Sequence, residues 1–271
     1  MRCQQVPTAS SPVASLLSLL ALMPMGLSAP AMAAPAQSSG CSAPRLGRYA
    51  VMGMGTVKAS GQATPEARLL EERWLPGGVV QGTVIERLGK LQRTAGYKGS
   101  VKLVGTCLAR VNRELPWGVQ VSEAVLDGKG RPLYSLDRDT GTVITGRWLP
   151  MAPGACKPAD LNGVVLSSQV GVTWEKGGWR PNAVVQREEW RDGGVKGIAL
   201  SSTDGVGDTE AYSGTLKLDA NSCWASLSQR DAKGTPYNYR ALIVNGRAGA
   251  RGYLYLQNDP TDLTVGWLVR D

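Results

Sequence analysis

Apolar and polar residues alternate with a period of two along short segments of this chain. In the segment YKGSVKL, Tyr97 and Val101 fall on one face while Lys98 and Lys102 fall on the other. The segment YSGTLKL, residues 212–218, repeats the same division. This alternation is typical of strands with one buried face and one face in water, and a helical period is hard to find. The pattern therefore predicts an all-β protein.

Glycine-rich turn signals separate these segments. The sequences LPGG (residues 75–78) and RDGG (residues 191–194) supply the glycines that a tight hairpin needs for positive φ angles. Counting the runs between turns gives seven or eight short antiparallel strands in each half of the chain. A module of this size with one apolar face must close on itself or stack two sheets, and closure removes exposed edges. We therefore predict two tandem antiparallel β-barrels of about eight strands each, with β-sandwiches as the alternative.

The two halves of the chain repeat the same landmarks in the same order. EERWLPGG begins at Glu71 and EEWRDGG at Glu188, YKGSVKL recurs as YSGTLKL, and Cys107 is matched by Cys223. The spacing between the copies drifts by only a few residues, as expected of a tandem duplication with small loop insertions. We predict an internal repeat with a first module at residues 41–153 and a second at residues 154–271.

Residues 1–33 have the three-part layout of a secretory signal peptide. Arg2 is followed by an apolar run over residues 13–23 and then by small residues at positions 31–33. The apolar run is shorter than the ~20 residues that cross a bilayer, so no transmembrane span is expected after cleavage. We predict cleavage after Ala33, a linker at residues 34–40, and export to the periplasm or the extracellular space.

Removal of the leader leaves four cysteines: Cys41, Cys107, Cys156 and Cys223. An even number in an exported protein predicts disulfides. The chain has no histidine and these cysteines have no C-x-x-C spacing, so no metal site is predicted. If each module folds alone, the pairs are Cys41 with Cys107 and Cys156 with Cys223. Pairing between modules is the alternative, and it would break the symmetry of the repeat.

A series of short motifs runs through each module. In the first module these are G-x-Y at Gly47 and Tyr49, a Gly-Gly hairpin, Y-x-G leading to a cysteine, V-x-x-G, and a closing glycine. This order resembles that of bacterial secreted modules of the allene-oxide-cyclase-like barrel kind, along most of each copy. The resemblance implies an eight-stranded barrel, usually of unassigned function in bacteria, and it carries over no catalytic residue.

The candidate binding residues are two carboxylates, each with a tryptophan two positions later: Glu72 with Trp74, and Glu188 with Trp190. Alternation places each glutamate on the face of its tryptophan. Inside a barrel such a carboxylate would have a raised pKa and could transfer a proton or orient a ligand. We favour the simpler interpretation that this face lies outside near the hairpin, with the glutamate in water and the tryptophan packed over a neighbour.

The loop STDGVGDTE offers Asp204, Asp208 and Glu210 as oxygen ligands of the kind that calcium prefers. The spacing does not match a calcium-binding loop and the first module has no counterpart, so we predict a solvated hairpin loop. The absence of histidine excludes Ser-His-Asp and Cys-His catalysis.

Charge is divided unequally between the modules. The first carries 16 Lys and Arg against 9 Asp and Glu, whereas the second carries 13 of each. The excess in the first module could attract an anionic surface with a salt-dependent affinity. Such an excess is more often only a solvated face, and nucleic acid is not the expected partner.

These observations favour an exported, non-enzymatic binding or envelope-associated protein that needs no cofactor and has an unidentified ligand. The candidate partners are a small apolar ligand and an anionic envelope polymer. One alternative, suggested by the resemblance, is a cofactor-free cyclase or isomerase whose barrel positions a hydrophobic substrate, with Glu72 or Glu188 and a tyrosine as its polar groups. Another is a module that adheres to glycans or anionic surfaces through exposed tryptophan and tyrosine.

Overall fold

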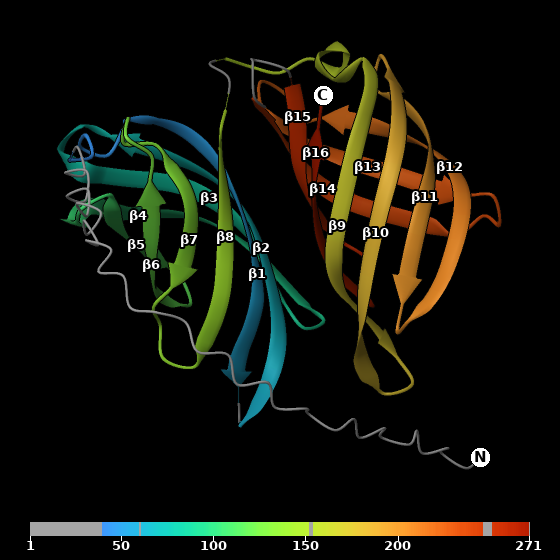
Figure 1. Cartoon of the computed structure of the whole chain (residues 1–271), viewed down its shortest axis with the longest axis horizontal. Helices are drawn as coiled ribbons and strands as arrows, with labels where there is room; N and C mark the ends of the chain where they lie inside the picture. The colour runs from blue at the N-terminus through green and yellow to red at the C-terminus, as the bar shows by residue number, and fades with distance from the viewer. Residues whose placement is uncertain (1–39, 60, 152–153, 246–250, 271) are drawn as a thin grey trace, which may run out of the picture. The chain divides into compact units, whose positions relative to one another are not determined.

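The structure is a computed structural model that describes residues 40–59, 61–151, 154–245 and 251–270 (Figure 1). The predicted signal peptide, residues 1–33, lies outside the described residues, as does the predicted linker apart from Gly40. Within the described part of the chain, no helix is both long enough and apolar enough to cross a membrane.

The first eight strands form a closed antiparallel barrel in which each strand pairs with the next and β1 pairs with β8. A short 3-10 turn, η1 (Pro76–Gly78), joins β2 to β3. The strands are β1 (Gly47–Ala59), β2 (Gln62–Leu75), β3 (Val79–Leu88), β4 (Leu91–Gly105), β5 (Leu108–Leu115), β6 (Gly118–Leu126), β7 (Pro132–Asp137) and β8 (Thr142–Pro150).

The next eight strands form a second closed barrel with the same order of pairing, and β16 returns to β9. The 3-10 turn η2 (Pro158–Leu161) precedes it. The strands are β9 (Gly163–Glu175), β10 (Gly178–Arg191), β11 (Gly194–Thr203), β12 (Val206–Leu218), β13 (Trp224–Asp231), β14 (Pro236–Asn245), β15 (Arg251–Gln257) and β16 (Asp262–Val269). The prediction of two all-β barrels is confirmed, and the alternative of sandwiches is wrong.

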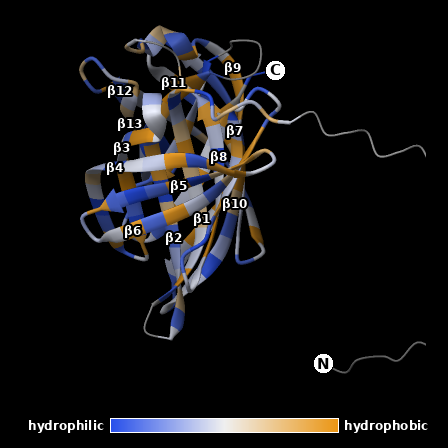
Figure 2. Cartoon of the chain, turned by 90° about the vertical axis from the view of Figure 1, so that its left-hand side faces the viewer, coloured by the Kyte–Doolittle hydropathy of each residue, from blue (hydrophilic) through white to orange (hydrophobic). Residues whose placement is uncertain are grey.

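Alternation along the strands divides each barrel into an inner and an outer face. In β4, Tyr97 and Val101 are buried while Lys98 and Lys102 are exposed. Figure 2 shows the same alternation of hydrophilic and hydrophobic residues along strands such as β5 and β6. The period of two seen in the sequence therefore identifies which side chains point into each barrel.

Two of the predicted glycine-rich hairpins have the backbone conformation that requires glycine. In the turn between β2 and β3, Gly77 and Gly78 have φ angles of 76° and 74°. In the turn between β10 and β11, Gly193 has a φ angle of 87°. A side chain with a Cβ is strained in this region, which explains both glycines of the first hairpin and Gly193 of the second; the other residue of the second hairpin with a positive φ is Asp192, at 48°.

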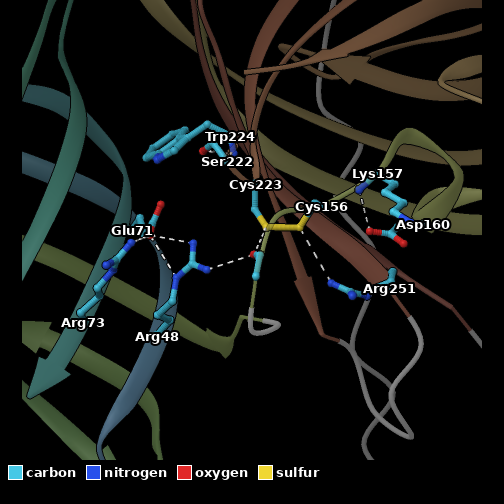
Figure 3. The surroundings of a disulfide bond; sticks show 11 residues. Arg48, Glu71, Arg73, Cys156, Lys157, Asp160, Ser222, Cys223, Trp224 and Arg251 are labelled. Atoms are coloured by element: carbon cyan, nitrogen blue, oxygen red, sulfur yellow. Dashed lines mark hydrogen bonds and ion pairs between the residues drawn. A yellow bond between two sulfur atoms is a disulfide. The ribbon is translucent and has the colours of Figure 1, made fainter. Parts of the chain in front are cut away.

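Both predicted disulfides are present, Cys41–Cys107 and Cys156–Cys223, with Cα atoms 5.0 and 4.9 Å apart. The prediction of pairing within each half is confirmed. Around the second disulfide (Figure 3), the side chain of Asp160 accepts a hydrogen bond of 2.8 Å from the backbone N–H of Lys157 and so closes the η2 turn. Each disulfide ties the segment before the first strand of its barrel to the turn between the fourth and fifth strands of that barrel.

Candidate ligand-binding cavity

Glu72 lies at the centre of the first barrel and is fully buried. Its carboxylate accepts hydrogen bonds from Trp74 Nε1 at 2.6 Å, from the Tyr97 hydroxyl at 2.8 Å and from Arg113 Nε at 2.6 Å. Three donors, one of them the buried cation Arg113, therefore compensate the cost of removing this charge from water. Burial, with the Glu72 charge as the next cause, raises the pKa of Tyr97 far above its usual value, so Tyr97 is a fixed donor.

Glu188 has the same place in the second barrel and is also fully buried. Its carboxylate accepts from Trp190 Nε1 at 2.7 Å, from the hydroxyls of Tyr212 and Tyr253 at 2.8 and 2.9 Å, and from Gln229 Nε2 at 3.4 Å. All four donors are neutral. Burial raises the pKa of the Glu188 carboxyl, and the hydrogen bonds act in the opposite direction.

The favoured interpretation of Glu72, Trp74, Glu188 and Trp190 as residues on an outer face is wrong. Alternation groups these residues correctly, but their face is the inner one, and the side chains of Glu71 and Arg73 occupy the outer one. A period of two divides residues between faces without saying which face is buried, and a glutamate on a strand favours the wrong choice.

A glycine on the neighbouring strand gives each tyrosine room to reach its carboxylate. Gly82 pairs with Tyr97 and Gly197 pairs with Tyr212. A Cβ atom at Gly82 would lie 2.4 Å from the Tyr97 ring, and one at Gly197 would lie 2.6 Å from the Tyr212 ring. Each tyrosine therefore lies across a glycine, which fixes the direction of its hydroxyl.

In the first barrel a network of charged side chains continues from Glu72 across the interior. Arg113 donates to Ser122 Oγ at 2.8 Å, and Ser122 donates to Asp137 at 2.7 Å. Asp137 forms an ion pair with Arg68. Arg68 in turn pairs with both Glu66 and Glu86, and Arg93 pairs with Glu86. These long side chains fill the interior and leave a void of only about 10 Å³ beside Arg68 and Arg113.

Glu66 gives this network a dependence on pH. Burial raises the pKa of Glu66 to about 7; Arg68 lowers it and Glu86 raises it further. Because the folded-state pKa lies above the usual value of 4.5, this group stabilises the fold fully below pH 4.5 and loses its contribution as pH rises through 7.

We expect Glu66→Gln to be more stable relative to the natural protein at pH 8 than at pH 5, because glutamine cannot ionise. Melting temperatures of both proteins at the two pH values measure this difference. A stability difference that is the same at both pH values would contradict the expectation.

Three long charged side chains of this network have shorter, uncharged counterparts in the second barrel. Strand register shows which positions of the two interiors are equivalent. Arg68 of β2 pairs with Gly53 of β1 and Glu86 of β3. In the second barrel, Val184 of β10 has the same place and pairs with Gln169 of β9 and Ser201 of β11. Likewise Arg113 pairs with Gly99 as Gln229 pairs with Gly214. Val184, Ser201 and Gln229 thus occupy the positions of Arg68, Glu86 and Arg113. The same register aligns Ser122 with the longer Tyr239 and Arg93 with Asp208, so the space is left open where the three charged side chains are shortened.

The result is a cavity of about 300 Å³ inside the second barrel. It opens at the end of the barrel that carries the turns β9–β10, β11–β12, β13–β14 and β15–β16. The strands place its lining in three zones. The buried floor consists of Gln169, Gln186, Tyr212, Gln229 and Tyr239; the walls include Thr173, Asn182, Ser201 and Thr264; and the rim, next to the turns, carries Asp208, Glu210, Asp231, Lys233 and Asp262.

Polar groups of the floor retain free hydrogen-bonding capacity. Oε1 of Gln186 accepts from Ser167 and from Gln169, which leaves the Nε2 group of Gln186 without a partner among the described residues. Nε2 of Gln229 donates to Glu188, which leaves the Oε1 atom of Gln229 similarly unused within the described part of the chain. A buried polar surface with unused donors and acceptors is suited to binding a polar molecule.

The loop that carries Asp204, Asp208 and Glu210 was predicted to be a solvated hairpin loop, but two of these three residues line the cavity. Lys233 pairs with Asp208 and Glu210, at 3.3 Å from the first, and these three residues line the rim of the cavity. Asp204 lies outside the cavity lining and is 4.0 Å from Arg180. Among the described residues, no group of three or more acidic or cysteine side chains is arranged to hold a metal ion.

Sequence reasoning missed the glutamines of the floor. Gln169, Gln186 and Gln229 are buried although glutamine is usually exposed. Their signal is positional: each lies on the inward face of a strand by alternation. Gln229 lies 41 positions after Glu188, and Arg113 lies 41 positions after Glu72, so Gln229 is the counterpart of Arg113 in the second barrel.

Comparison with known proteins shows no matching family model and no matching curated protein. Among solved structures, a porin-like protein from Bacteroides uniformis is 8% identical, with a TM-score of 0.24, over 86% of this chain and 98% of that chain. Kievitone hydratase from Nectria haematococca is 6% identical, with a TM-score of 0.26, over 82% of this chain and 88% of that chain. These likenesses are too distant to bear on function. The eight-stranded barrels implied by the allene-oxide-cyclase-like resemblance are present, and no family match supports the family itself.

Proposed function

We propose that this chain is an exported binding protein in which the second barrel holds a small polar ligand and the first is a filled structural barrel. The observation that supports this is the 300 Å³ cavity, which lies among polar side chains in one barrel while the equivalent volume in the other is occupied by ion pairs. The polar lining favours a polar ligand over the small apolar ligand expected from the sequence.

The arrangement of the buried carboxylates favours binding over catalysis. Tyr212 lines the cavity, but its hydroxyl is committed to Glu188, and burial, with the Glu188 charge as the next cause, raises its pKa far above the usual value for tyrosine. Glu188 itself is held by four donors and does not line the cavity. A carboxylate–tyrosine pair of this kind orients the floor and has no free position for proton transfer to a ligand. The alternative of a cyclase or isomerase using Glu72 or Glu188 therefore has less support.

We also propose that the chain arose by a tandem duplication and that the protein is exported. Equivalent carboxylate, tryptophan and tyrosine positions and equivalent disulfides in both barrels support a tandem duplication with modules at residues 41–153 and 154–271. Two disulfides support an oxidising compartment, the periplasm or the extracellular space, reached by the signal peptide. An anionic envelope polymer remains the proposed partner for the basic excess of the first module.

Native mass spectrometry of the protein purified from the envelope of its own host tests this function. We expect a non-covalent adduct that disappears on denaturation, and we expect Ser201→Trp, which fills the cavity, to lose it. Ser202→Trp is the matched control, because the neighbouring Ser202 is exposed and lies outside the cavity lining. A bare natural protein, or an adduct that Ser201→Trp retains, would overturn the proposal.

A further inference from the structure

The rim of the cavity in the second barrel carries an excess of negative charge. Four carboxylates line it, those of Asp208, Glu210, Asp231 and Asp262, against the single ammonium of Lys233. Lys233 pairs with Asp208 and Glu210. Arg87 donates to the carbonyl oxygens of Gln257 and Asp259 and does not line the cavity. The rim therefore attracts cations and repels anions.

Asp231 and Asp262 are the rim carboxylates that Lys233 does not pair with among the described residues. Asp262 accepts from the Thr173 hydroxyl at 2.7 Å, and Asp231 accepts from the Tyr237 hydroxyl at 3.3 Å. Neutral donors hold both carboxylates in place, and neither forms an ion pair among the described residues, although the nearby Arg87 guanidinium partly offsets the charge of Asp262. Tyr237 also lines the cavity, so the carboxylates lie beside an aromatic ring of the kind that favours a bound cation.

The floor has a different chemistry. Its amide and hydroxyl groups, with the unused Nε2 of Gln186 and Oε1 of Gln229, are neutral donors and acceptors. Such groups recognise hydroxyls, each of which both donates and accepts. A volume of about 300 Å³ is at the lower end of the ~300–1,000 Å³ typical of ligand sites, which indicates a compact ligand.

From these two zones we infer that the cavity recognises a compact polyhydroxylated amine, an amino sugar or amino polyol, with its hydroxyls on the floor and its ammonium between Asp231 and Asp262. This inference rests on the proposed function and specifies its ligand class. An anionic sugar would meet like charge at the rim, and an apolar ligand would leave the floor amides without partners.

Three sugars of similar size and different charge test the inference: glucosamine, glucose and glucuronate, in titration calorimetry and thermal-shift measurements near pH 6.5. We expect glucosamine to bind at least about tenfold more tightly than glucose, with no detectable binding of glucuronate. We expect its affinity to fall as salt is added, because the attraction is partly exposed.

Asp262→Asn and, independently, Asp231→Asn are expected to lower glucosamine affinity about tenfold and to bring it close to that of glucose. Glu189→Gln is the matched control, because it removes an exposed carboxylate of the same barrel outside the cavity. Equal binding of the three sugars, preference for glucuronate, or no effect of either asparagine variant would overturn the inference.

The outcomes separate this inference from the proposed function. If the envelope-purified protein carries an adduct sensitive to Ser201→Trp but glucosamine shows no preference, the cavity binds a ligand of another class and only the inference fails. If the envelope-purified protein carries no adduct, or one that Ser201→Trp retains, the proposed function itself fails.

Discussion

Glu72→Gln is expected to destabilise the first barrel by about 3–5 kcal/mol, the cost typical of removing one partner from a buried ion pair. Glutamine has nearly the shape of glutamate, but its amide cannot neutralise Arg113, whose Nε lies 2.6 Å from the carboxylate and whose side chain is 2% exposed. The buried guanidinium would be left with reduced compensation. Urea unfolding followed by tryptophan fluorescence measures the loss, since Trp74 is hydrogen-bonded to the altered side chain.

Glu188→Gln in the second barrel is the matched control for this prediction. Its donors are three hydroxyl or indole groups and one amide, all neutral, so the expected cost is about 1–3 kcal/mol. Adding Arg113→Gln to Glu72→Gln removes the uncompensated cation and is expected to restore part of the stability. A cost at Glu72 no larger than that at Glu188, with no rescue by the double change, would show that the charge pair does not stabilise the first barrel.

Replacing both cysteines of either disulfide by alanine is expected to cost about 4 kcal/mol of unfolding free energy. The bonds close loops with sequence separations of 66 and 67 residues, and the chain-entropy model relates the stabilisation to loop length. The two variants, Cys41→Ala with Cys107→Ala and Cys156→Ala with Cys223→Ala, should therefore lose similar amounts. Urea midpoints without reductant measure both losses.

Unfolding the natural protein in the presence of a reductant is the control for the disulfide variants, because its midpoint should then fall to or below theirs. When the reductant is added to either variant, its urea midpoint should fall further only by the amount due to the one disulfide that the variant retains. A loss below about 1 kcal/mol in both variants would mean that strain or residual structure cancels the entropic gain.

The sequence alone was enough to predict the all-β class, the strands and the cysteine pairs, and it favoured two closed barrels while leaving sandwiches as the alternative. Alternation in segments such as YKGSVKL assigns each side chain to a face, and the Gly-Gly hairpins at Gly77 and Gly193 mark where strands reverse. The cysteines could be paired because the two halves repeat the same spacing. These features are local or periodic, so they can be read along the chain.

The location of Glu72 and Glu188 could not be predicted in the same way. Burial of a carboxylate depends on donors that lie far away in sequence, such as Arg113, 41 positions after Glu72, and Tyr253, 65 positions after Glu188. Propensity assigns a glutamate to the surface unless those partners are known. The cavity was also not predictable, since it depends on differences in side-chain length at several equivalent positions of the two barrels, such as that between Arg68 and Val184.

Glu188 lies between two parts of the second barrel's interior, one filled by apolar side chains and one hollow. On the side of the disulfide the interior is sealed by apolar groups such as Leu161, Trp190 and Leu216, and on the side of the turns it is hollow. On the proposed function, fold stability and ligand choice are therefore encoded at different positions of the same strands. Exchanging residues such as Thr173, Asn182 and Ser201 would then redirect recognition and leave the sealed base unchanged, which would make this barrel a scaffold for engineered receptors.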